Sequence, residues 1–111
     1  GVTKYTKSLA ADVQSADLYA KGYVVSVTEM DTSGTYGNAT YLISDYIDGA
    51  TGSFQVYRGF GLNGEKFNKA DAKRIKAGDE VIIKGKVVNY KGNTPQFAQG
   101  STIVSLNGQT K

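Results

Sequence analysis

Hydrophobic and β-branched residues gather in three short runs in the first half of the chain, and turn-forming residues separate these runs. The runs are KGYVVSVTEM at 21–30, ATYLISD at 39–45 and SFQVYRG at 53–59. β-Branched and aromatic residues favour extended chain, whereas Gly, Asp and Ser favour the turns between strands. The pattern therefore predicts three strands joined by loops.

The last third of the chain predicts a hairpin. An apolar run over 81–88 is followed by the turn YKGNTP at 90–95 and by a second extended run over 96–106. Gly, Asn and Pro between two strand-like runs are typical of a hairpin turn. Between the third and fourth strands, residues 65–75 place apolar side chains at roughly helical spacing, and Ala77-Gly78-Asp79 supplies a stop. We expect a short helix there.

These elements predict an all-β domain with one short helix. Five strands with a helix between the third and the fourth form the Greek-key barrel called the OB-fold. A β-sandwich needs more strands, and an SH3-like barrel lacks this helix. With 111 residues the chain is long enough for one core. We expect the domain to span 20–107, after a polar lead-in over 1–19 with a helical turn near 8–13, and before a tail over 108–111.

Composition narrows the classes of function. The chain contains no Cys and no His, which removes thiol nucleophiles, disulfides, Ser-His-Asp triads and most zinc sites. Among the 10 Asp and Glu residues, no spacing singles out a catalytic pair. We therefore expect a non-catalytic protein without a cofactor or a metal. No apolar run approaches the roughly 18 residues that a membrane-spanning helix requires.

The net charge of +3 is unevenly distributed along the chain. Residues 58–91 hold nine basic and four acidic side chains, a balance of +5, whereas residues 1–57 hold three basic and six acidic ones, a balance of −3. A basic half attracts phosphates, and a solvated basic surface equally serves solubility alone. Charge by itself leaves both interpretations open.

Strand alternation selects candidate binding residues. In the third strand Phe54 and Val56 are the better core residues, so Tyr57 is expected to face outward. In the fourth strand the lysines mark the polar face, and in the second strand Leu42 is the better core residue. For any single Tyr, half-buried packing within its strand is the alternative role. The candidate ligand-binding residues are Tyr41, Tyr57, Arg58, Lys84, Lys86 and Tyr90.

Three stretches of the sequence resemble a known family. They are GNATYLISD at 37–45, FQVYRGFGLNGEKF at 54–67 and IKAGDEVIIKGKVVNYKGNTPQFAQGSTI at 75–103. They are similar to OB-fold domains of secreted or lipid-anchored proteins of Bacteroidetes, often labelled nucleic-acid-binding lipoproteins, and the likeness covers about residues 20–107. The resemblance implies a location in the cell envelope or outside the cell. Many relatives carry an acid after the turn proline, where this chain has Gln96, so a ligand role of that acid does not transfer.

We expect a binding module, and two kinds of ligand remain open. OB-folds bind single strands by stacking bases on aromatic rings and holding the backbone with basic side chains. The first hypothesis is a monomeric module for single-stranded DNA or RNA, which uses the outer face of strands two to four and the loop over 31–37 as one wall. The second is a protein- or glycan-interaction module of a surface or periplasmic protein that uses the same aromatic residues.

Overall fold

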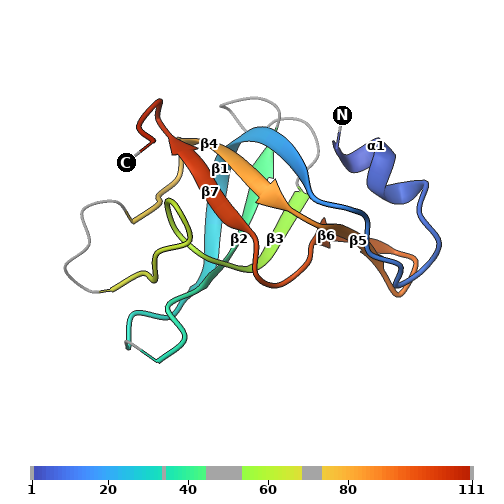
Figure 1. The fold of residues 1–111 in the computed structure, drawn as a ribbon, viewed down its shortest axis with the longest axis horizontal. Coiled ribbons are helices and arrows are strands. Elements are labelled where there is room, and N and C mark those ends of the chain that lie inside the picture. Colours follow the sequence, from blue (N-terminus) through green and yellow to red (C-terminus); the bar gives the residue numbers. More distant parts are fainter. Residues whose placement is uncertain (1, 34, 45–53, 69–73, 111) are drawn as a thin grey trace.

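One sheet of seven strands forms most of the structure, a computed structural model that describes residues 2–33, 35–44, 54–68 and 74–110. A single helix, α1 (Val2–Lys7), precedes the strands within these residues. The strands are β1 (Leu18–Met30), β2 (Ala39–Ser44), β3 (Phe54–Gly59), β4 (Glu80–Gly85), β5 (Val87–Tyr90), β6 (Thr94–Phe97) and β7 (Thr102–Leu106). They lie in the order β5-β6-β3-β2-β1-β4-β7 (Figure 1).

The long strand β1 joins two parts of the sheet. Its first half pairs antiparallel with β4, and its second half pairs antiparallel with β2. Gly22 lies near this change of partner, where a Cβ would approach Ile43 to 3.2 Å. Two register shifts follow within residues 24–29. Bulges and glycines bend a strand and increase its twist, so β1 can serve both neighbours.

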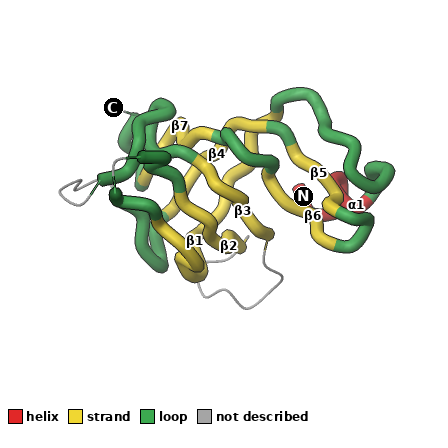
Figure 2. The backbone as a smooth tube through the Cα atoms, turned by 90° about the horizontal axis from the view of Figure 1, so that it is seen from below, coloured by secondary structure: helices red, strands yellow, loops and turns green. Residues whose placement is uncertain are grey.

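The last two predicted strands are each divided into two shorter strands, β4 and β5 in the first and β6 and β7 in the second. Lys86 alone separates β4 from β5, and residues 98–101 separate β6 from β7. The two strands on either side of each interruption have different neighbours. β4 pairs with β1 and β7, whereas β5 pairs with β6. β6 also pairs in parallel with β3, whereas β7 pairs with β4. Figure 2 shows β5 and β6 at one end of the molecule beside α1.

The core is formed by the inward side chains of this sheet together with Leu62, Phe67 and Ile75 from the segment between β3 and β4. Its largest fully buried members are Tyr41, Phe67, Phe97, Ile83, Ile103, Val24, Val56, Val81 and Val87. The rings of Phe54 and Phe97 meet edge to face with their centroids 5.6 Å apart, which joins the parallel pair β3 and β6. Complete burial of one such side chain stabilises the fold by about 1.5–3 kcal/mol.

The N-terminal segment packs on β5. The backbone N–H of Asp12 donates to the carbonyl of Asn89 at 3.1 Å, and that of Ser15 donates to the carbonyl of Val87 at 2.9 Å. The Val87 N–H in turn donates to Ser15 Oγ at 3.0 Å. This cover explains why Val87, Val88 and Asn89 are all buried although they alternate in direction. The predicted lead-in therefore belongs to the folded body, and its helix lies at Val2–Lys7 rather than near 8–13.

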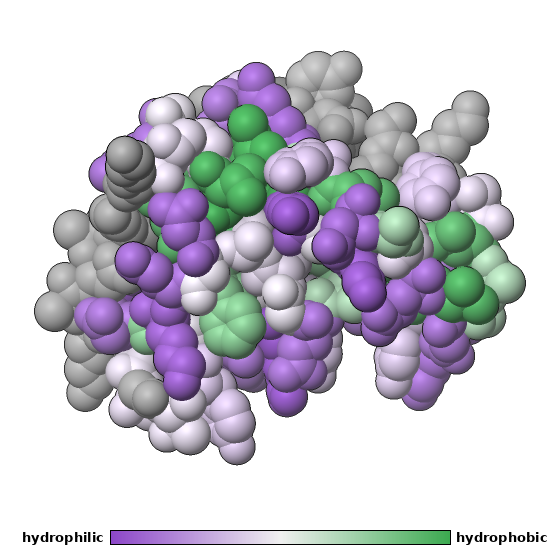
Figure 3. All heavy atoms as spheres, viewed as in Figure 1, coloured by the Kyte–Doolittle hydropathy of each residue, from purple (hydrophilic) through white to green (hydrophobic). Residues whose placement is uncertain are grey.

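Both ends of the strand order are covered by isolated bridges. The bridged pairs are Ala11 with Asn89, Gln14 with Val88, Leu62 with Ile103 and Gln109 with Leu106. Covered edges offer fewer free backbone groups to another chain. Over β4 and β7, Figure 3 shows a hydrophobic area among hydrophilic residues, and Ile82 and Val104 on these strands are half-buried.

The structure agrees with the predicted β-rich fold and differs from it in detail. The sheet has seven strands and is not a closed five-stranded barrel, because Lys86 and residues 98–101 interrupt the last two predicted strands. In the predicted helix over 65–75, residues 65–68 and 74–75 are not helical, and 69–73 lie outside the described residues. The described part contains no helix long and apolar enough to cross a membrane.

Candidate functional site

The loop between β1 and β2 is organised by one carboxylate. Asp31 Oδ1 accepts hydrogen bonds from the N–H and the hydroxyl of Ser33, at 2.9 and 2.6 Å. Asp31 Oδ2 accepts from the N–H groups of Tyr36 and Gly37, at 2.9 and 3.2 Å. These hydrogen bonds, led by the one from the Ser33 side chain, lower the pKa of Asp31 to about 2. The ionised carboxylate therefore holds the loop in shape at neutral pH.

The far side of this loop is fixed by residues that follow β3. The Phe67 N–H donates to the carbonyl of Gly37 at 2.9 Å, and Lys66 Nζ donates to the carbonyl of Thr35 at 3.2 Å. Gly37 has a φ of +65°, and a Cβ there would lie 2.3 Å from Lys66 Cβ. Both the left-handed backbone and the lack of space require glycine at this position.

Arg58, the last residue but one of β3, has an unusual backbone conformation. Its φ is +45°, which costs a residue with a side chain about 1–2 kcal/mol. The pairing of β2 with β3 shifts register between Ala39 and Tyr41, and Thr40 Oγ1 accepts a hydrogen bond from the Arg58 N–H at 3.1 Å. The guanidinium carbon lies 5.1 Å from the centroid of the Tyr57 ring. Such bulges re-aim a side chain and are frequent beside functional sites.

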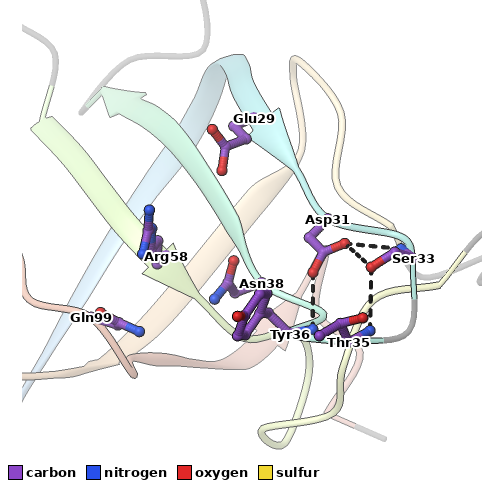
Figure 4. A pocket seen from close by; sticks show the side chains of 8 residues that line it. All are labelled: Glu29, Asp31, Ser33, Thr35, Tyr36, Asn38, Arg58 and Gln99. Carbon is purple, nitrogen blue, oxygen red and sulfur yellow. Dashed lines mark hydrogen bonds between the residues drawn. The ribbon is translucent and has the colours of Figure 1, made fainter.

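A cavity of about 620 Å³ lies between the loop and Arg58. Its lining residues are Glu29, Asp31, Ser33, Thr35, Tyr36, Asn38, Arg58 and Gln99. Figure 4 shows Arg58 and Gln99 on one side and the loop residues on the other, with Asn38 between them. The Tyr36 side is open, since this residue is 68% exposed. The cavity thus combines an aromatic ring, a guanidinium, amides and hydroxyls with two carboxylates.

One of the six predicted site residues, Arg58, lines this cavity, and a second, Tyr57, is in contact with the Arg58 guanidinium. Arg58 is exposed, and Tyr57 faces outward and is half-buried. The outward orientation of Tyr57 follows from the alternation of β3, in which Phe54 and Val56 are buried. The predicted orientation of β3 is confirmed.

Lys84, Lys86 and Tyr90 are less buried than their direct neighbours toward the core, as predicted, but their row is divided between two strands. Lys84 Nζ lies 5.9 Å from the centroid of the Tyr19 ring on β1. Lys86 is exposed at the break between β4 and β5, and Tyr90 is 46% exposed near the β5–β6 turn. Val88, which the same alternation places outward, is buried under the N-terminal segment. The neighbouring strands change at Lys86, and the N-terminal segment covers Val88, so the exposed row is interrupted there.

The prediction that Tyr41 faces outward is wrong. Tyr41 is completely buried, and it is paired across the sheet with Val56, an inward residue of β3. Residues directly opposite one another on neighbouring strands share a face. Burial raises the pKa of the Tyr41 hydroxyl, and this hydroxyl has no hydrogen-bond partner among the described residues. Tyr41 is therefore a core residue that a ligand does not reach.

Sequence reasoning missed three lining residues, Glu29, Asn38 and Gln99. The loop over 31–37 was expected to form one wall, and the run of Asp, Thr, Ser and Gly after β1 is the signal for it. Glu29 and Gln99 line the same cavity because the strand order of the folded sheet brings their segments to it. No local pattern marks them.

Comparisons with protein families, curated proteins and solved structures gave no match for this chain. Among the described residues, no group of three or more Asp and Glu side chains is placed to hold a metal ion. Function is therefore inferred from the geometry of the cavity.

Proposed function

We propose that the protein is a non-catalytic module that binds single-stranded nucleic acid. The observation that carries the proposal is the cavity that brings the exposed ring of Tyr36 together with the guanidinium of Arg58. A base stacked on an aromatic ring contributes about 1–3 kcal/mol of binding free energy. A guanidinium binds a phosphate through two parallel hydrogen bonds.

The setting of Arg58 supports a role in binding phosphate. Its guanidinium lies over the Tyr57 ring, a contact that orients the planar group. In the part of the chain that the structure describes, Arg58 forms no ion pair with a carboxylate. The left-handed backbone of Arg58 lowers the stability of the fold locally. Such strain is frequent at functional sites, and the display of an oriented cation to a ligand is a function that accounts for it here.

The strand pairing supports an OB-like connectivity for the module. We take β4 and β5 as one pass interrupted at Lys86, and β6 and β7 as one pass interrupted at 98–101. The five passes then pair in the order 1-2-3-5-4, with the fourth also beside the first. In OB-folds, the face of strands two and three and the loop between strands one and two bind oligonucleotides. The cavity uses that loop and the end of β3. The family resemblance adds the proposal of a location in the cell envelope or outside the cell.

The test is a fluorescence-anisotropy titration with mixed-sequence single-stranded DNA and RNA at low and moderate salt. Tyr36→Ala removes the stacking ring and should weaken binding about 5- to 100-fold, whereas Tyr36→Phe keeps the ring and should bind as the parent does. Arg58→Gln should weaken binding and reduce the slope of log K against log salt by about 0.7, the value for one phosphate contact on a single strand. Absence of binding at low salt would contradict the proposal.

A glycan is the second candidate ligand, and one observation favours it. Glu29 places a carboxylate in the same cavity, beside the amides of Asn38 and Gln99. Sugar hydroxyls are bound by acceptors and amides of this kind, and an exposed Tyr ring receives the apolar face of a sugar. Glycan binding should respond little to salt, in contrast to phosphate binding. The same titration with neutral oligosaccharides separates the two ligands.

A further inference from the structure

A second, smaller cavity adjoins the first. Its volume is about 270 Å³, and its lining residues are Gln14, Asp17, Gly85, Lys86, Ala98, Gln99, Gly100 and Ser101. Gln99 lines both cavities. The segment over 98–101 therefore separates them, with Arg58 on one side and Lys86 on the other.

Backbone hydrogen bonds attach this segment to both cationic residues. The Gly100 N–H donates to the carbonyl of Arg58 at 3.2 Å, and the Ala98 N–H donates to the carbonyl of Lys86 at 2.8 Å. Two residues of extended chain span at most about 7 Å. The backbones of Arg58 and Lys86 are thus held close together, and each projects an exposed cation beside Gln99.

The charge of Lys86 is open to a ligand. Asp17 lines the same cavity, yet it forms no ion pair with Lys86, and the described residues contain no other carboxylate paired with this lysine. A lysine ammonium binds phosphate as a point charge. Gln99 between the two cations offers an amide that can donate to a phosphate or to a base edge.

We propose that the Lys86 cavity is a second phosphate subsite, so that a bound strand crosses the segment over 98–101 at Gln99 and contacts both Arg58 and Lys86. This inference rests on the proposed function and extends its site beyond the cavity that contains Tyr36. Asp17 then opposes the bound strand, because like charges repel across a shared cavity. Its removal should strengthen binding.

The experiment measures binding of an oligothymidylate and of a thymidine mononucleotide to the whole chain over a range of salt concentrations. Lys86→Gln should weaken oligomer binding and reduce the salt slope by about 0.7, while leaving mononucleotide binding at Arg58 unchanged. Asp17→Asn should tighten oligomer binding. Lys84→Gln is the matched control, since Lys84 lies over the Tyr19 ring on β1 and should change neither quantity.

The outcomes separate this inference from the proposed function. If Arg58→Gln weakens oligomer binding and Lys86→Gln behaves like Lys84→Gln, the second subsite is wrong and the proposed function stands. Weaker binding by Asp17→Asn would indicate that the small cavity receives a cationic group, which also overturns the inference. If the unaltered chain binds no oligomer, the proposed function itself fails. Lys86 is exposed, and the contact that attaches it to the fold is the hydrogen bond from the Ala98 N–H to its backbone carbonyl, so its side chain can be replaced without unfolding.

Discussion

Two regions of the surface differ in how their side chains are held. One is the cavity beside Arg58, and the other is the row of Lys84, Lys86 and Tyr90 along β4 and β5. At the cavity, backbone and side-chain hydrogen bonds fix the groups that a ligand would meet: Asp31 holds the loop, and Thr40 holds the backbone of Arg58. Along the row, Lys84 lies over an exposed Tyr ring, and Lys86 stands at a strand break. Basic and aromatic side chains are present in both regions, but the cavity beside Arg58 brings the two kinds together, whereas the smaller cavity at Lys86 has no aromatic residue in its lining.

This difference shows that a site needs fixed geometry as well as suitable residue types. Preorganised groups lose less conformational freedom on binding, so more of their interaction energy appears as affinity. The residues of the β4–β5 row point to different surroundings because β5 is covered by the N-terminal segment. The comparison can be tested at residues that define each region.

The largest effect is expected from the two tyrosines whose roles the structure separates. Tyr41→Ala removes a completely buried ring and should lower the free energy of unfolding by about 3–5 kcal/mol. Tyr57→Ala removes a half-buried, outward ring and should lower it by less than about 1 kcal/mol, while weakening ligand binding. Urea unfolding followed by circular dichroism measures both. Equal losses of stability would show that the two rings do not differ in burial.

The next effect concerns the glycine that closes the loop. In Gly37→Ala the new Cβ would lie 2.3 Å from Lys66 Cβ, on a backbone with a left-handed φ. This variant should lower the free energy of unfolding by more than about 2 kcal/mol and abolish binding at the cavity. Gly64→Ala is the matched control, because Gly64 has a φ of +78° but its Cβ would find nothing nearer than 3.6 Å. Gly64→Ala should lower the free energy of unfolding by about 1–2 kcal/mol and leave ligand binding unchanged. Similar costs for both variants would mean that the contact with Lys66 is easily relieved.

A smaller effect is expected when the loop is titrated with acid. The hydrogen bonds to Asp31 lower its pKa in the folded protein from 3.8 to about 2. The ionised group therefore stabilises the folded loop fully above the unfolded value, and this contribution is lost as the pH falls through the folded pKa. The backbone amide shifts of Tyr36 and Gly37, followed by NMR, should move with a midpoint near 2 and not move in Asp31→Asn. A midpoint near 3.8 would show that these hydrogen bonds do not form in solution.

The first three strands were predictable because each is short, alternating and bounded by turn residues. The predicted ranges 21–30, 39–45 and 53–59 correspond to Leu18–Met30, Ala39–Ser44 and Phe54–Gly59. The break at Lys86 was not predicted, because Lys84 and Lys86 fit the polar positions of one alternating strand over 81–88. The hydrogen bond from the Ala98 N–H to the Lys86 carbonyl, a tertiary contact, lies at that break.

Only part of the candidate site could be predicted, for a similar reason. Arg58 and the loop after β1 carry local signals, namely a basic residue at a strand end and a run of turn residues. Glu29 and Gln99 are seventy positions apart and line one cavity because of the strand order. The face of Tyr41 was misassigned because a phenol is acceptable both inside and outside, and its pairing with Val56 decides between them.

The smallest effect isolates the hydroxyl of that tyrosine. Tyr41 Oη is buried without a hydrogen-bond partner among the described residues, and leaving such a group unsatisfied costs about 1–3 kcal/mol. Tyr41→Phe keeps the ring and removes the hydroxyl, so the free energy of unfolding should stay unchanged or rise by about 1 kcal/mol, and binding at the cavity should not change. A loss of stability in this variant would reveal a hydrogen bond to the hydroxyl, and a loss of binding would return Tyr41 to the site.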